Sequence, residues 1–263
     1  MNSDEVEVQR QLTQGGFIVT NGAQVFRVML LEHVNGSAPL VVFHGPLPPK
    51  AQELWVAEVS RPQPRETSPG VICFASGTSI TTPRGPRQVQ DLRPGDWVQT
   101  RDNGPQQVLW TGQRRFSTTR LRSFPGLAPV RIRAAAFGTG VPDRDLLVSP
   151  RHRILVRSPQ AQSIYGQSEV LVAAQDLIDD SRIFRETPRC DITYVHILLN
   201  RHEVIVANGV ECESFHPDDA DPAMLDQSDR ERLEQTLGQA PYGGHARRVL
   251  TRPEAAILLH RAA

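Results

Sequence analysis

The sequence predicts an all-β protein, and three observations lead to this fold class. Short runs rich in Val, Ile, Phe and Trp recur along most of the 263 residues, and β-branched and aromatic residues are typical of strands. Gly, Pro and Asn-Gly pairs separate these runs at short intervals, as they do in turns between strands. Helix-like patterns follow only after residue 217. The chain is long enough for one large β-domain with smaller modules on either side.

Residues 1–60 predict a small β module. Its first Asn-Gly pair, at 21–22, lies between two β-rich runs and predicts a hairpin, and a second pair at 35–36 predicts another turn. This module contains no convergent set of titratable side chains, so we expect a structural or binding role for it. Its strand-like runs fall at 17–20, 25–31, 40–43 and 54–59.

A linker is expected over residues 61–72. The prolines at 62, 64 and 69 cannot support a strand ladder, and the remaining residues are mostly polar. The linker ends at Ile72, directly before Cys73. The sequence therefore predicts a domain boundary here.

Residues 73–217 predict the main β-domain, and residues 218–263 predict a helical tail. Within the main domain, the stretch from 114 to 129 is expected to be an irregular, basic loop. In the tail, Ser228 and Glu231 match a capping box, and a second helix is expected from Thr251. The expected strands of the main domain include 97–100, 107–110, 130–132, 146–148, 170–177, 192–199 and 204–210.

Composition excludes several kinds of partner and site. Lys and Arg together number 29, as do Asp and Glu, so the overall charge indicates neither nucleic acid nor a membrane as a partner. The three cysteines, Cys73, Cys190 and Cys212, are too few and too far apart for a disulfide framework, and none forms a C-x-x-C pair. We therefore expect no cofactor and no metal.

The sequence carries no apparent targeting segment. Residues 1–7 are acidic and lack the apolar stretch of a signal peptide. No later window approaches the roughly 18 uninterrupted apolar residues of a membrane-spanning helix. We expect a protein that is cytoplasmic as synthesised, with export by a route that needs no signal peptide left open.

Four motifs in the main domain resemble those of Hint (hedgehog/intein) domains. Cys73 opens the stretch C-F-A-S-G-T, and the segment 92–98 is similar to the family's L-x-x-G-D-x-V element. Ser149 and His152 match an S/T-x-x-H pattern, and V-A-N-G-V at 206–210 resembles the closing strand of inteins. The resemblance is to bacterial intein-like and hedgehog-type autoprocessing domains. It implies a horseshoe-like, Hint-type β-fold.

The resemblance also implies a chemistry at the junction between Ile72 and Cys73. The Cys73 thiol would attack the Ile72 carbonyl in an N-to-S acyl shift and form a thioester. In this interpretation His152 protonates the leaving nitrogen, Ser149 orients the peptide, and His196 activates the thiol. The substrate is then the protein's own N-terminal segment, and water, an external thiol or an amine resolves the thioester.

The sequence departs from the splicing pattern at the end of the domain. Inteins end with His-Asn before the downstream nucleophile, whereas residues 210–217 here contain no asparagine. We therefore expect single-turnover, autocatalytic peptide-bond cleavage rather than full splicing.

Two other interpretations remain open at this point. In the first, the β-domain is a catalytically inactive scaffold in a binding or surface protein. In the second, Cys73, His152 and His196 hold a metal ion, but their spacing contains no local ligand pair, which disfavours zinc. Intact mass separates the processing protein from the scaffold, because only the first yields fragments divided between Ile72 and Cys73.

Overall fold

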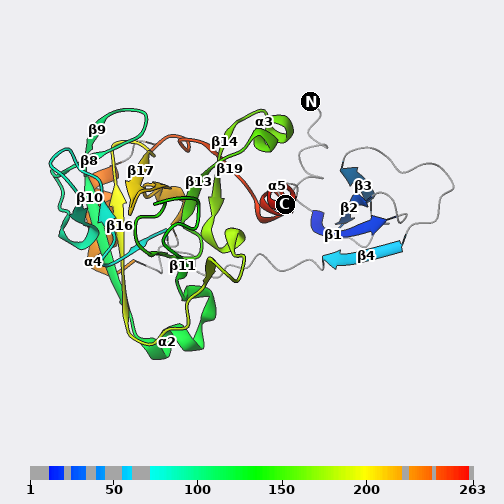
Figure 1. The fold of residues 1–263 in the computed structure, drawn as a ribbon, viewed down its shortest axis with the longest axis horizontal. Helices are drawn as coiled ribbons and strands as arrows, with labels where there is room; N and C mark the ends of the chain where they lie inside the picture. The colour runs from blue at the N-terminus through cyan, green and yellow to red at the C-terminus, as the bar shows by residue number, and fades with distance from the viewer. Residues whose placement is uncertain are drawn as a thin grey trace. The chain divides into compact units, whose positions relative to one another are not determined.

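The chain divides into two compact units, Met1–Thr67 and Ser68–Ala263. Figure 1 shows the β-strands of both units and the few short helices of the second. The structure, a computed structural model, describes residues 12–20, 25–33, 40–44, 55–60, 72–220, 225–238 and 241–260.

The first unit contains a four-stranded antiparallel sheet in the order β3-β2-β1-β4. Thr20 pairs with Val25 at the end of the first hairpin, so the two strands meet around the predicted Asn-Gly turn. The turn residues themselves lie outside the described residues. The strands are β1 (Leu12–Thr20), β2 (Val25–His33), β3 (Leu40–His44) and β4 (Trp55–Ser60).

The second unit is built from two larger sheets and a two-stranded ribbon. A six-stranded sheet has the order β10 (Trp110–Phe116), β16 (Ile192–Leu198), β5 (Phe74–Ala75), β12 (Leu146–Val148), β11 (Val130–Ile132), β15 (Ile183–Arg185). A seven-stranded sheet has the order β19 (Arg248–Val249), β14 (Glu169–Ala173), β13 (Arg153–Arg157), β18 (Val210–Glu213), β17 (Val204–Ala207), β6 (Ser79–Ile80), β7 (Arg87–Gln88). The ribbon pairs β8 (Trp97–Gln99) with β9 (Pro105–Gln107).

One hydrophobic core joins the two larger sheets. Phe74 and Val148 of the six-stranded sheet belong to the same buried cluster as Ile154 and Ile205 of the seven-stranded sheet. The strands alternate as a half-buried sheet requires: in β11, Val130 and Ile132 are buried while Arg131 between them is partly exposed. Burial of such apolar surface is the main stabilising term of the domain. The all-β class predicted from the sequence is confirmed.

The expectation of an irregular loop from 114 to 129 is wrong. Strand β10 continues to Phe116 and pairs with β16 along its whole length. Its middle is polar and partly exposed, so composition alone hides the strand. Helix α2 (Thr118–Ser123) follows, because the Ser117 side chain accepts a hydrogen bond from the Arg120 amide as an N-cap. A turn of 3-10 helix, η2 (Pro125–Leu127), completes the segment.

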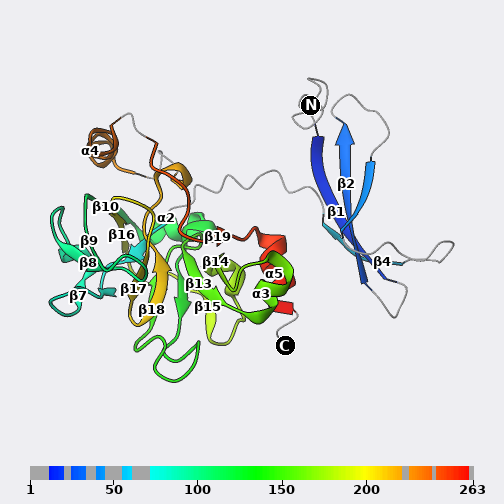
Figure 2. The same cartoon turned by 90° about the horizontal axis from the view of Figure 1, so that it is seen from above.

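The helices of the tail occur where the sequence predicts them, with a shifted start. Helix α4 (Gln227–Leu237) has Asp226 as its N-cap, two residues before the expected Ser228. Helix α5 (Arg252–His260) follows, and Figure 2 shows it beside α3 (Pro159–Tyr165), a short helix that the sequence did not predict. None of the described helices has the length and apolar character needed to span a membrane. Short 3-10 turns lie at η1 (Val89–Asp91), η3 (Ala174–Leu177) and η4 (Pro217–Asp219).

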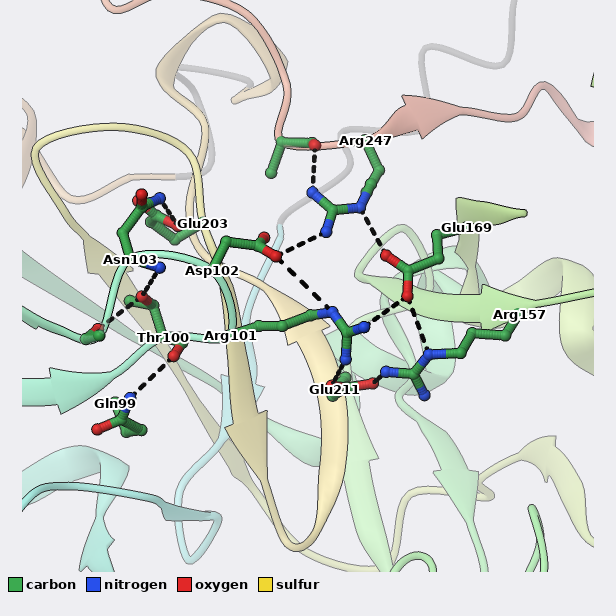
Figure 3. Close-up of polar contacts among 12 residues, drawn as sticks. Gln99, Thr100, Arg101, Asp102, Asn103, Arg157, Glu169, Glu203, Glu211 and Arg247 are labelled. Atoms are coloured by element: carbon green, nitrogen blue, oxygen red, sulfur yellow. Dashed lines mark hydrogen bonds and ion pairs between the residues drawn. The ribbon is translucent and has the colours of Figure 1, made fainter. Parts of the chain in front are cut away.

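An ion-pair network attaches the C-terminal segment to the seven-stranded sheet (Figure 3). Arg247 donates to Glu169 of β14 and to Asp102, at 2.9 and 2.8 Å. Arg101 and Arg157 also contact Glu169, at 2.6 and 3.0 Å. Partial burial raises the pKa of Glu169, but the bonds from Arg247 and Arg157 outweigh it, so the pKa is lowered. A single exposed ion pair contributes little to stability, but several charges that share partners in a network contribute more.

Candidate functional site

The register of three strands brings the predicted site residues together. Cys73 directly precedes β5, which pairs with β12 on one side and with β16 on the other. Ser149 follows the last residue of β12, and His196 lies within β16. Cys73, directly before this central strand, is thus flanked by residues from both neighbouring strands.

Ser149 holds the backbone of Cys73 from both sides of the residue. The Cys73 amide donates to Ser149 Oγ at 2.9 Å. The Ser149 amide in turn donates to the Cys73 carbonyl at 3.0 Å. The first of these bonds fixes the nitrogen of the Ile72–Cys73 peptide, which is the leaving atom in an acyl shift.

The His196 ring contacts both the carbonyl and the thiol of the same junction. Its Nδ1 lies 2.9 Å from the Ile72 carbonyl oxygen, which can only accept, so Nδ1 carries the proton. The Cys73 Sγ lies 3.3 Å from Nε2 and 3.4 Å from Nδ1. The thiol therefore sits against the ring, beside the nitrogen that bears the lone pair. The carbonyl, the amide and the thiol of the Ile72–Cys73 junction therefore each have a close contact with Ser149 or His196.

Burial controls the charges at this site. Desolvation lowers the pKa of His196 to about 4, although the bond to the Ile72 carbonyl favours the protonated form. Desolvation also raises the pKa of Cys73 well above its ordinary value, and the Ser149 hydrogen bond offsets part of that effect. Both side chains are therefore neutral near pH 7. A thiol in this state would need a base before it could act as a nucleophile.

His152 lies next to this group without bonding to it through its ring. Its amide donates to the Ser149 carbonyl at 3.0 Å, and its ring packs on Phe74 with centroids 4.3 Å apart. Within the described residues, neither ring nitrogen has a hydrogen-bond partner. Desolvation lowers the His152 pKa to about 4, with Glu213 opposing the shift. Buried polar atoms without partners are rare and costly, and they concentrate at functional sites.

An apolar cover closes over Cys73. Phe116, Leu121, Leu127 and Tyr194 form one buried cluster with it, and the Tyr194 hydroxyl donates to the Leu127 carbonyl at 2.9 Å. Cys73 is 0% exposed, so α2 and η2 shield the thiol from water. Sequence reasoning missed this cover because Phe116, Leu121 and Leu127 fall in the stretch that was expected to be an irregular loop.

Two aromatic rings fix the His196 side chain. Phe215 packs edge-on against it at 4.9 Å between centroids, and Trp110 lies at 5.9 Å. The Phe215 amide donates to the Ile197 carbonyl at 2.8 Å, which continues the pairing beside β16. The chain that follows β18 thus brings an apolar ring to the site. Sequence reasoning noted the missing asparagine in this stretch but not the contact.

Comparison with known proteins gives the family. A model described as "Hint domain" matches residues 72–219, which is more than half of the chain. The chain belongs to the Hint domain family. Among solved structures, one match is titled "Crystal structure of MchDnaB-1 intein", with 14% identity, coverage of 54% of this chain and 99% of that chain, and a TM-score of 0.32. No curated protein matches.

The Hint domain contains all four predicted site residues, and its family match begins at Ile72. This assigns a self-processing type of domain to the chain. Asn208, in the intein-like V-A-N-G-V motif, has a φ of 46° and accepts from the Ser79 amide at 2.8 Å, so it is a turn residue of the β17–β18 hairpin. Cys212 is buried in the hydrophobic core, while Cys190 is exposed.

Proposed function

We propose that the Hint domain cleaves its own chain through an N-to-S acyl shift at Ile72–Cys73. The observation that carries this proposal is the contact of one His196 ring with both the Cys73 thiol and the Ile72 carbonyl. Ser149 holds the amide nitrogen of the same peptide. Such prior positioning of reacting groups can supply several powers of ten in rate.

The atoms of the step balance within the site. As Sγ bonds to the Ile72 carbonyl carbon, the thiol proton passes to Nε2 of His196, and Nδ1–H donates to the developing oxyanion. The oxyanion then re-forms the carbonyl as the C–N bond breaks, and the proton that the thiol gave to His196 passes on to the Cys73 nitrogen, which becomes an amine while His196 returns to its neutral form. The products are a thioester between Ile72 and Sγ and a free α-amine on Cys73.

The protonation of the leaving nitrogen falls to Ser149 and His152. Ser149 Oγ contacts that nitrogen at 2.9 Å. The His152 pKa of about 4 makes the imidazolium form about a thousandfold rarer than the neutral form at pH 7. His152 therefore acts as a relay with one N–H and one lone pair, and it does not store a proton. Neither ring nitrogen has a hydrogen-bond partner within the described part of the chain, so both can take part in such a relay.

The outcome that we propose is cleavage and not splicing. Phe215 is the residue from the end of the domain that packs on His196, and its side chain cannot cyclise as an asparagine does. The substrate is the N-terminal segment of the same chain. Water, or a thiol or amine from another molecule, resolves the thioester.

Intact mass spectrometry tests the proposal on the full chain, with and without added thiol. We expect thiol-dependent fragments divided between Ile72 and Cys73, absent in Cys73→Ala. Cys190→Ser is the matched control, because it removes an exposed thiol that is not part of the buried Cys73 cluster and should cleave like the wild type. A single uncleaved mass under every condition would contradict the acyl shift.

The inactive scaffold is the second candidate. The complete burial of Cys73 and its raised pKa favour it, because they oppose formation of the thiolate. The same mass experiment decides between the two.

A further inference from the structure

Three histidines meet near the ends of three strands of the seven-stranded sheet: His202 precedes β17, His216 follows β18 and His245 precedes β19. His216 and His245 stack with ring centroids 4.2 Å apart. His202 lies edge-on to both, at 5.3 and 5.2 Å. Imidazole rings gathered in this way are a common feature of metal sites.

Two of these histidines and one carboxylate have the spacing of metal ligands. One ligand atom each from His216, Asp219 and His245 lies within 4.8 Å of the others. His216 is the N-cap of the 3-10 turn η4, which ends at Asp219 and so sets both side chains on one side of the turn. Bonds of about 2.0–2.1 Å to a tetrahedral ion would place ligand atoms about 3.3 Å apart. Small side-chain rotations suffice to close the site.

The hydrogen bonds of His216 leave one ring nitrogen, Nδ1, available to bind a metal ion. Its Nε2 donates to the Gly243 carbonyl at 3.0 Å, which leaves the Nδ1 lone pair for a ligand. That lone pair accepts only a long bond of 3.3 Å from the Asp218 amide. Histidines that bind metals usually donate their second ring N–H to a carbonyl or carboxylate. The Gly243 bond is of this kind.

The other two ligands face each other directly, and their surroundings favour a cation. His245 Nε2 lies 2.7 Å from Asp219 Oδ2. Arg153 bridges Asp219 and Glu213 at 2.6 and 3.0 Å, so two carboxylates share one guanidinium. Asp219 and Glu213 thus bring two negative charges against the single positive charge of Arg153, and this excess of negative charge favours a divalent ion.

We propose that His216, Asp219 and His245 bind a divalent transition-metal ion of the zinc class. Two imidazoles and one carboxylate suit zinc and its neighbours better than magnesium or calcium, which prefer oxygen ligands. The Hint match ends at Asp219, whereas His245 lies beyond it. The ion therefore ties the C-terminal extension to the Hint domain, and water would complete its coordination.

Zinc titration of the metal-free full chain tests this site. The Cys73→Ala background keeps the chain intact, so the result does not depend on the proposed cleavage. We expect one zinc ion per chain by calorimetry and a higher melting temperature with zinc. His245→Ala should weaken binding by more than about 10–100-fold, the loss typical of a disturbed outer-shell partner. The His245 side chain is 31% exposed, so this variant should fold.

Arg247→Ala is the matched control. It removes two ion pairs from the same segment but no ligand atom, so we expect lower stability with unchanged zinc affinity. Substitution with Co²⁺ gives an independent readout, because thiolate ligands produce charge-transfer bands that imidazole and carboxylate do not. The absence of stoichiometric zinc binding would overturn the proposal, as would full binding by His245→Ala or a thiolate band with cobalt.

Discussion

The buried His152 side chain is expected to lower the stability of the folded protein, whatever its role in cleavage. In the Cys73→Ala background, which cannot cleave, we expect His152→Leu to stabilise the protein at pH 7. Both ring nitrogens are buried without hydrogen-bond partners among the described residues. Leaving a buried polar group such as this imidazole unsatisfied costs about 1–3 kcal/mol. A leucine of similar size removes that cost, so a gain of about 1–3 kcal/mol is expected.

The pH dependence gives a second magnitude. Desolvation lowers the His152 pKa from 6.5 to about 4, so its contribution to stability is fully present above pH 6.5 and is lost as the pH falls toward 4. Between pH 7 and pH 5 the unfolded chain binds a proton there and the folded chain does not, which costs about 2 kcal/mol. His152→Leu should therefore lose about 2 kcal/mol less than its parent over this interval.

Urea denaturation at pH 7 and pH 5 measures both effects. His152→Gln is the control that separates them, because glutamine does not titrate but still buries polar atoms. His152→Gln should therefore lose the pH dependence of stability that His152 causes, but it should not show the gain in stability at pH 7. The reasoning is refuted if His152→Leu is destabilised by more than about 1 kcal/mol at pH 7, or if its loss between pH 7 and pH 5 equals that of the parent.

Three further predictions concern thiol-induced cleavage in the otherwise native chain. Ser149→Ala should slow the appearance of fragments by about 10–100-fold, because the leaving nitrogen loses its anchor; an unchanged rate would remove Ser149 from the site. Ile72→Gly should raise thioester hydrolysis, since a β-branched residue crowds the carbonyl, and equal rates would contradict this. Leu121→Ala should cost about 2–5 kcal/mol of stability yet speed thiolysis by opening the cover over Cys73. Slower or equal thiolysis, measured by mass against time, would show that the cover does not limit access.

The sequence predicted strands best where burial alternates along the chain. Val130–Ile132 and Leu146–Val148 are strands with the predicted bounds, because two buried residues flank one partly exposed residue in each. Strand β10 escaped prediction because Gln113, Arg114 and Arg115 occupy its middle, and pairing with β16 stabilises it where composition does not. Helix α3 escaped because it is too short for a periodic pattern.

Local sequence motifs identified residues of the site, but they did not predict the contacts between residues that lie far apart in the chain. Ser149 and His152 were found through a local pattern, and the structure places Ser149 on the Cys73 amide. The contact of His196 with the Ile72 carbonyl depends on the register of β5 against β16, which no local pattern encodes. Of the three proposed metal ligands, His216 and Asp219 form a local His-x-x-Asp pattern, but His245 lies far along the chain.

The charges at Cys73 constrain the order of events in the proposed acyl shift. The thiol pKa lies well above its ordinary value of 9.0, while the imidazole pKa of His196 is about 4. Moving the proton between them in the resting site therefore costs at least roughly 7 kcal/mol, before the attraction of the resulting ions is counted. A preformed thiolate–imidazolium pair is thus scarce, and proton transfer must accompany S–C bond formation. The same desolvation strengthens the hydrogen bond from His196 Nδ1 to the oxyanion once charge develops there. Burial thus keeps the junction inert at rest and favours the one path in which charge appears on the carbonyl oxygen.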